Sequence, residues 1–156
     1  MKYIDEIEKE IQSSGEEFFS VGPIERKTIE QYENLLGLEF PVSYKDFLMK
    51  YGSLSFCGDT YYGITSKGIE EKQVPCVLFV TEQARDAGDI SPKMIKIKSS
   101  GYGPSYSIDT ETLGKEGEAV IVETQLSFKR DGVKKIIADN YGEFLLNQIK
   151  EAIEDI

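Results

Sequence analysis

The chain has 156 residues, of which 40% are hydrophobic and 29% charged, and it contains no histidine. This composition is typical of one soluble globular domain with a sizeable core, and the apolar runs are far shorter than a membrane helix. The missing histidine excludes serine–histidine and cysteine–histidine nucleophiles, imidazole metal ligands and histidine acid–base catalysis.

Acidic side chains gather at the two ends of the chain. The net charge is −10, and residues 1–17 and 139–156 each hold four more acids than bases. Because phosphate binding needs a basic surface, this distribution argues against direct contact with nucleic acid. It favours a basic partner protein, since complementary charge speeds association. Solubility is the alternative reason for such a charge.

Residues 3–36 predict two helices joined by an extended stretch. Over residues 3–12, apolar side chains recur at helical spacing on one face and most acids lie on the other. This acidic start lacks the basic head and apolar core of a signal peptide, so we expect a cytoplasmic protein without a membrane partner. Residues 18–21 are extended, and a second helix runs over about 24–36.

The rest of the chain is organised around residues 35–64. Gly37 can end the second helix, and Pro41 prevents a helix from running through it. We expect Ser43 to cap a short helix that Gly52 ends. The apolar stripe of that helix consists of Tyr44, Phe47, Leu48 and Tyr51. The residues after it that predict strand are Leu54, Phe56, Tyr61, Tyr62 and Ile64.

Residues 75–98 predict a helix and then a strand. Strong helix formers favour a helix over about 75–87 with Pro75 in its first turn, although residues 74–80 alone also suit a buried strand. In residues 94–98 the lysines alternate with isoleucines, which predicts a half-exposed strand with its lysines facing outward.

Strands continue into the last third of the chain. A turn at residues 99–104 and a strand at 105–109 complete a β-hairpin. A buried strand follows over 119–123, and Leu126 and Phe128 extend it.

The final segment predicts the closing helix. Residues 133–138 suit either a strand or the approach to a helix, and Asn140 then caps the helix with Glu143 three residues later. Helices lie in the first half and at the end, with strands grouped between them. This order predicts an α+β fold, and we expect a single domain over residues 1–156.

Neither the glycine-rich turn nor the cysteines predict a catalytic site. The segment 101–104 lacks the third glycine of a phosphate loop, because Tyr106 stands at that position and a strand follows. A hairpin turn is the expected structure. Cys57 and Cys76 have no histidine base and lie among apolar residues, so we expect two buried free thiols.

Two acidic pairs invite a chemical interpretation. Asp109 and Glu111 alternate in strand register, as paired catalytic carboxylates can. A solvated strand end or turn is the simpler explanation, and it applies equally to Glu70 and Glu71. We therefore predict no catalytic residue, no cofactor and no metal site.

Tyrosines give the best candidate for a binding surface. The chain has nine, with clusters at Tyr61-Tyr62 and between Tyr102 and Tyr106. Tyrosine combines a large rigid contact area with a hydroxyl group, which suits recognition surfaces. Packing within strands and turns is the alternative.

One segment carries a resemblance to a known family. The pattern Leu-x-Phe-Pro-x-Ser-Tyr-Lys-x-Phe-Leu-x-x-Tyr-Gly at residues 38–52 resembles the signature of the SUKH superfamily. That superfamily includes fungal cell-wall-assembly regulators and many bacterial immunity proteins. Weaker motifs follow in the family's order as far as Phe144-Leu145-Leu146, whereas the tryptophan that members often carry near the first strands is absent.

The resemblance implies a fold and a function. The fold would be a curled, largely antiparallel sheet flanked by helices. The function would be that of a non-enzymatic immunity protein, which binds and neutralises a cognate secreted toxin of the LXG type. A nuclease toxin would present a basic surface to an acidic immunity protein.

The resemblance assigns no toxin-contacting residue, so the candidates come from the sheet-edge turns. They are Asp59, Tyr61, Tyr62, Glu70, Glu71, Tyr102, Asp109 and Glu111. The acidic terminal helices are the competing face. Two other functions remain open, namely a regulatory or scaffold module that binds cellular proteins, and a hydrolase that uses carboxylates alone.

Overall fold

The structure is a computed structural model that describes residues 2–156. Its helices are α1 (Lys2–Ser14), α2 (Arg26–Leu36), α3 (Val42–Tyr51), α4 (Val77–Asp86), α5 (Phe128–Asp131) and α6 (Tyr141–Glu154), with a 3-10 turn η1 at Gly68–Glu70. Its strands are β1 (Phe18–Ser20), β2 (Leu54–Phe56), β3 (Asp59–Tyr61), β4 (Met94–Ser99), β5 (Ser105–Leu113), β6 (Ala119–Thr124) and β7 (Lys134–Ala138).

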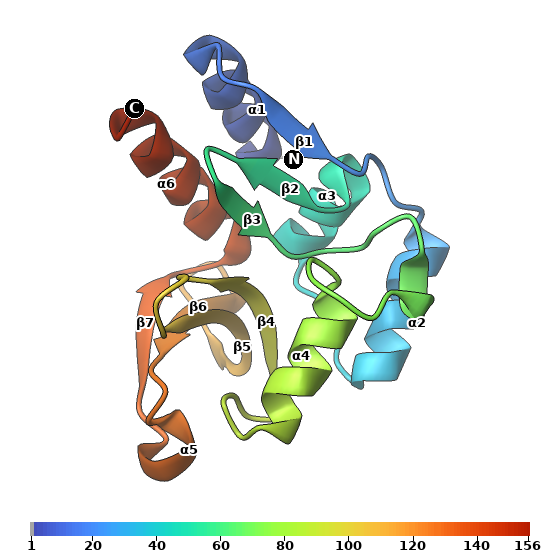
Figure 1. The fold of residues 1–156 in the computed structure, drawn as a ribbon, viewed down its shortest axis with the longest axis vertical. Coiled ribbons are helices and arrows are strands. Elements are labelled where there is room, and N and C mark those ends of the chain that lie inside the picture. Colours follow the sequence, from blue (N-terminus) through green and yellow to red (C-terminus); the bar gives the residue numbers. More distant parts are fainter. Residues whose placement is uncertain (1) are drawn as a thin grey trace.

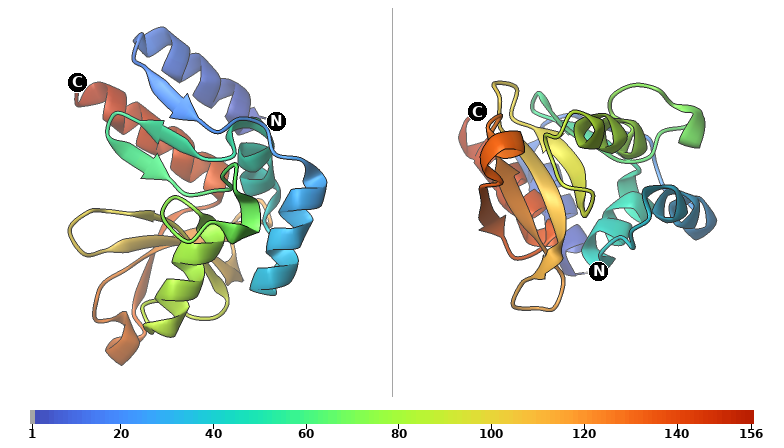
Figure 2. Two further views of the ribbon diagram at one scale, coloured as in Figure 1. Left: turned by 45° about the vertical axis from the view of Figure 1, so that its right-hand side comes forward. Right: turned by 90° about the horizontal axis from the view of Figure 1, so that it is seen from below.

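The strands form two antiparallel sheets, ordered β1-β2-β3 and β4-β5-β6-β7 (Figure 1). The Tyr62 N–H donates to the Ile97 carbonyl at 2.9 Å and so links the end of β3 to β4. Helices flank both sheets, as the two views of Figure 2 show. The α+β class and the antiparallel pairing are therefore confirmed, with the curled sheet divided into two parts. No helix within residues 2–156 is both long and apolar enough to cross a bilayer.

The two ends of the chain lie against each other, because α1 packs along α6 (Figure 1). Gly142 permits this approach, since a Cβ at that position would collide with the Tyr3 ring. The same helix α6 also contacts α3, β6 and β7. The acidic segments that lie far apart in sequence thus become neighbours in space.

The signature segment sits at the centre of the core. Tyr44 of α3 is fully buried, its ring lies 4.7 Å from that of Tyr141, and its hydroxyl donates to the Tyr62 carbonyl at 2.8 Å. Gly52 ends α3 with φ +72°, and a Cβ on Gly52 would come within 2.8 Å of the Gly22 carbonyl oxygen. This explains why the segment needs a glycine after the helix.

Helix ends confirm one predicted cap and correct another. The Asn140 side chain accepts the Glu143 N–H at 2.8 Å, as expected. Ser43, by contrast, does not cap α3, because Pro41 occupies that position. Its backbone N–H and hydroxyl both donate to Glu118, at 3.0 and 2.8 Å, and its hydroxyl accepts the Gly142 N–H at 3.0 Å. Ser43 therefore joins α3, the β5–β6 turn and α6.

Other segments differ from the sequence-based expectations. β6 ends at Thr124, and Phe128 begins α5 instead of extending the strand, because its ring packs on a second apolar cluster that includes Val120 and Val122. Of residues 133–138, for which the sequence suited either a strand or the approach to a helix, Lys134–Ala138 form the edge strand β7. The 99–104 turn is confirmed as the link between β4 and β5.

The starts of two helices and the exposure of one cysteine also differ from the sequence-based expectations. α4 begins at Val77 instead of about residue 75, because the Pro75 carbonyl accepts the Gly63 N–H and holds that residue outside the helix. α2 begins at Arg26. The expectation of two buried thiols is wrong for Cys57, which is exposed, and right for Cys76. Cys57 occupies the two-residue β2–β3 turn at φ +50°, where a side chain projects away from the core.

The first prediction concerns the Glu118 contacts. Replacing Glu118 by alanine leaves the Ser43 donors, in a residue only 6% exposed, without their acceptor. We expect the free energy of unfolding to fall by about 1–3 kcal/mol. Urea unfolding followed by circular dichroism measures the change. Glu6→Ala, which removes an exposed acid from α1, is the control; equal losses in the two variants would contradict the role of Ser43.

The second prediction concerns alkaline pH. Burial raises the pKa of Tyr51 to about 12 and also raises the pKa values of Tyr32, Tyr44, Tyr61 and Tyr141 above the ordinary 10.0. Their contribution to stability is therefore complete below pH 10 and is lost as the pH rises through the folded-state values. We expect these five tyrosines to ionise only together with the loss of helical circular dichroism. Ionisation of these tyrosines in an intact fold would contradict the prediction.

Candidate partner-binding surface

A buried lysine lies where the two sheets meet α6. Lys98, in β4, is only 7% exposed. Its Nζ donates to Gln148 Oε1 at 2.6 Å and lies 3.4 Å from Asp59 Oδ1. The same nitrogen lies 5.2 Å from the Tyr61 ring centroid and 5.7 Å from that of Tyr106. A buried ammonium needs such partners, and we call these five residues the Lys98 junction.

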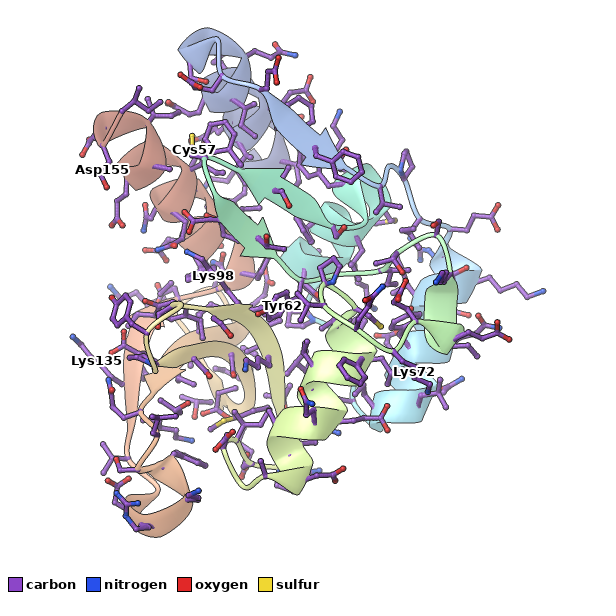
Figure 3. All side chains as sticks on the ribbon, in the orientation of Figure 1. Cys57, Tyr62, Lys72, Lys98, Lys135 and Asp155 are labelled. Atoms are coloured by element: carbon purple, nitrogen blue, oxygen red, sulfur yellow. The ribbon has the colours of Figure 1, made fainter. Side chains whose placement is uncertain are left out.

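A β-bulge places Lys98 there. The β4–β5 register shifts between Lys96 and Lys98, so that Ile95 pairs with Ile108 and Lys98 pairs with Tyr106. Residues two apart on β5 share a face, so Lys98 joins Ile95 on the side that α6 covers. The expectation that Lys98 faces outward with Lys96 is therefore wrong. Figure 3 shows Lys98 beneath α6, between the two sheets.

Carboxylates surround this junction. Glu123 of β6 pairs across the strands with Tyr106. The pKa of Tyr106 is raised by burial first and then by nearby charges that include Glu123, Glu151 and Asp59. The Asp59 side chain is 41% exposed, Glu123 is half-buried and Glu151 is exposed. We call Asp59, Glu123 and Glu151 the acidic rim; it draws one acid each from β3, β6 and α6.

Four of the sequence-predicted residues lie around this place. Asp59 and Tyr61 belong to the junction itself, and the Tyr62 hydroxyl donates to Ser99 Oγ at 3.1 Å. Tyr102, 82% exposed, projects from the β4–β5 turn. However, Tyr61 is fully buried and Tyr62 is 6% exposed. Packing within the fold, the alternative for the tyrosine clusters, therefore holds for Tyr61 and Tyr62, whereas Tyr102 is exposed.

The other four predicted residues lie elsewhere. Glu70 is exposed at the end of η1, whereas Glu71 is buried and accepts a hydrogen bond from Thr65. Asp109 is fully buried, and its Oδ2 lies 2.6 Å from Lys134 Nζ. The expected solvated strand end is wrong for Asp109, because β5 continues to Leu113. Glu111 is exposed on β5. The structure does not gather these acids.

Sequence reasoning missed four residues that complete the surface, namely Lys98, Glu123, Gln148 and Glu151, and it named Tyr106 only as part of a tyrosine cluster. The bulge that turns Lys98 inward leaves no sequence signal, since the segment alternates regularly. Glu151 lies in the acidic terminal helix, which the sequence predicted as an alternative binding face to the sheet-edge turns. In the structure, Glu151 lies one turn after Gln148 on α6, and Gln148 and Asp59 both contact Lys98, so those two faces adjoin.

The structure does not bring the two sequence-predicted acidic pairs together in one hollow. A hollow of about 500 Å³ beside α2 is lined by Glu70 but by none of the other three predicted carboxylates at positions 71, 109 and 111. Within residues 2–156, no three acidic or cysteine side chains lie close enough to hold one metal ion. What the surface does present is an exposed tyrosine and several acids on a rigid frame.

A comparison with protein families gives one match. The family model described as SUKH_6, SMI1-KNR4 cell-wall, matches residues 26–145, well over half of the chain. The match contains every strand except β1 and begins at the first residue of α2. The helix α1, the strand β1 and the end of α6 that carries Gln148 and Glu151 lie outside it.

The third prediction concerns the junction. Lys98→Met removes the cation that Asp59 and Gln148 contact, and we expect the free energy of unfolding to fall by about 1–3 kcal/mol. Lys135→Met is the matched control, because Lys135 is exposed on the edge strand β7, and its effect should stay within about 0.5 kcal/mol. Urea unfolding of both variants makes the test. A Lys98 variant as stable as the control would show that the junction is dispensable.

Proposed function

The chain belongs to the SMI1-KNR4 cell-wall family of the SUKH superfamily, and on this premise we propose that it is an immunity protein that neutralises a secreted toxin by binding it. Family membership supports an immunity or SMI1-KNR4-like protein-binding role. The toxin, and its nature as a nuclease with a basic surface, are the finer parts of the proposal.

The observation that carries the proposal is the acidic rim beside an exposed tyrosine. Three elements far apart in sequence contribute one carboxylate each, and Lys98 holds the junction beneath them together. A surface fixed in this way loses little conformational entropy on binding. Its charge complements the basic groove with which a nuclease holds phosphate, so binding would both steer the toxin and cover its groove.

A second function is a regulatory module of the cell-wall type, which the same family membership supports. It too would act by binding a protein. The two functions differ in their partner, because an immunity protein protects cells from one toxin whereas a regulatory module binds a resident cellular protein.

The test is co-expression with the toxin domain encoded beside the gene for this chain. We expect growth to be rescued and a stoichiometric complex to be recovered. If neither occurs, immunity is excluded and the regulatory module becomes the better proposal. Rescue without a complex would contradict neutralisation by binding.

The fourth prediction concerns the rim within that complex. We expect Glu151→Lys to slow association by about tenfold at low salt, because it inverts one charge of the acidic rim, and the effect should shrink as salt is added. Glu30→Lys, an exposed charge reversal on α2, is the matched control. Stopped-flow or surface-based kinetics measure both rates. Equal rates for the two variants would place the toxin away from the rim.

A further inference from the structure

The strand β1 leaves one edge of the three-stranded sheet open. Within residues 2–156, β1 pairs only with β2, and Phe19 faces Ser55 in that pairing. The Val21 N–H donates to the Ser53 carbonyl at 3.4 Å. Backbone groups alternate in direction along a strand, so Phe19 directs its N–H and carbonyl toward β2, as Val21 directs its N–H. Phe18 and Ser20 therefore direct theirs toward the open edge.

Exposed aromatic side chains flank this edge. Phe18 is 47% exposed and Phe19 is 68% exposed, on opposite faces of the strand. The Phe18 ring lies 6.4 Å from that of Tyr51 in an edge-to-face contact. Beside it is a hollow of about 250 Å³, which Ile11, Phe18 and Tyr51 line together with three polar residues. The edge thus has unpaired backbone groups and a place for an incoming side chain.

The charge around the edge is acidic. Glu16 and Glu17 precede β1 directly and are exposed, and residues 1–17 hold four more acids than bases. The Phe18 end of β1 also lies two strands from the acidic rim, because Phe18 pairs with Phe56 and Phe56 pairs with Asp59.

From these contacts we propose that the partner adds an extended, basic strand to the β1 edge. This rests on the proposed function and names how the partner binds. The Phe18 and Ser20 backbone groups would pair with the incoming strand, as in other strand-addition complexes. Lysine or arginine side chains would face Glu16 and Glu17, and one apolar side chain would enter the hollow beside Phe18.

A second copy of this chain fits the edge less well. Pairing of two β1 strands would bring together two α1 helices, each within a segment that carries four excess negative charges. Like charges at that distance oppose association. A basic strand meets no such repulsion, so the partner's strand is the occupant that the charge favours.

The experiment uses the complex with the toxin domain encoded beside the gene. Hydrogen exchange is measured for the backbone amides of residues 18–21 in the free chain and in the complex. We expect the Phe18 and Ser20 amides, which face the open edge, to exchange quickly in the free chain and at least about tenfold more slowly in the complex. Phe19 and Val21, already turned toward β2, should change much less.

Substitutions provide the independent measurement. Ser20→Pro removes an edge N–H that has no partner in the free sheet, and proline is tolerated at such positions. We expect it to weaken binding about tenfold more than Ser20→Ala, which keeps the N–H. Phe19→Ala should also weaken binding, whereas Leu35→Ala, the loss of a comparably exposed side chain on α2, should not.

The outcomes separate this proposal from the proposed function. A wild-type complex in which the Phe18 and Ser20 amides stay unprotected, or in which Ser20→Pro binds like Ser20→Ala, overturns strand addition and leaves immunity by binding intact. A dimer of the free chain that protects the same amides assigns the edge to a second copy and overturns the proposal. Failure of the wild-type chain to bind the toxin removes both.

Discussion

The fold depends on the burial of one tyrosine at the meeting point of three parts of the chain. The Tyr44 ring packs between Phe40 and Tyr141, which ties α3 to α6. Its hydroxyl donates to the Tyr62 carbonyl, and the N–H of that same residue donates to Ile97 in the second sheet. Two successive hydrogen bonds therefore run from α3 to β4. Because a buried hydroxyl needs a partner, the position of α3 is tied to the line along which the sheets meet.

That line also explains why a charge lies inside the molecule. Lys98 enters the junction because the β4 bulge turns it inward, and the cost of removing its ammonium from water is offset by a carboxylate, an amide and two aromatic rings. The partners come from β3, β5 and α6, so the junction forms only when both sheets and the last helix are assembled. The acidic rim borders this junction and is therefore held in place by the same three elements. A recognition surface needs such a fixed arrangement.

The charges of the molecule are divided between its ends. The helices α1 and α6 bring the acidic chain termini together, whereas α5, at the end of the molecule away from α1, carries Lys129 and Arg130 (Figure 1). The family match runs from the start of α2 to Leu145, near the start of α6, and leaves α1, β1 and the acidic end of α6 outside. The two surfaces proposed to bind a partner, the rim and the β1 edge, both include residues from those outer parts. A shared central fold, with terminal segments outside the shared part, suits a family whose members bind different proteins.

Local chemistry in the sequence determined the α+β class, most element positions, the Asn140 cap and the hairpin turn at residues 99–104, because capping, glycine and alternation act over a few residues. The tertiary structure alone decided the junction. A bulge reverses the face of Lys98, and the continuation of β5 buries Asp109. Ser43 does not form the expected helix cap and instead makes hydrogen bonds with Glu118 and Gly142. Each of these outcomes depends on groups that are distant in the sequence and adjacent in the fold. Contacts between residues tens of positions apart produce no periodic pattern in a single sequence.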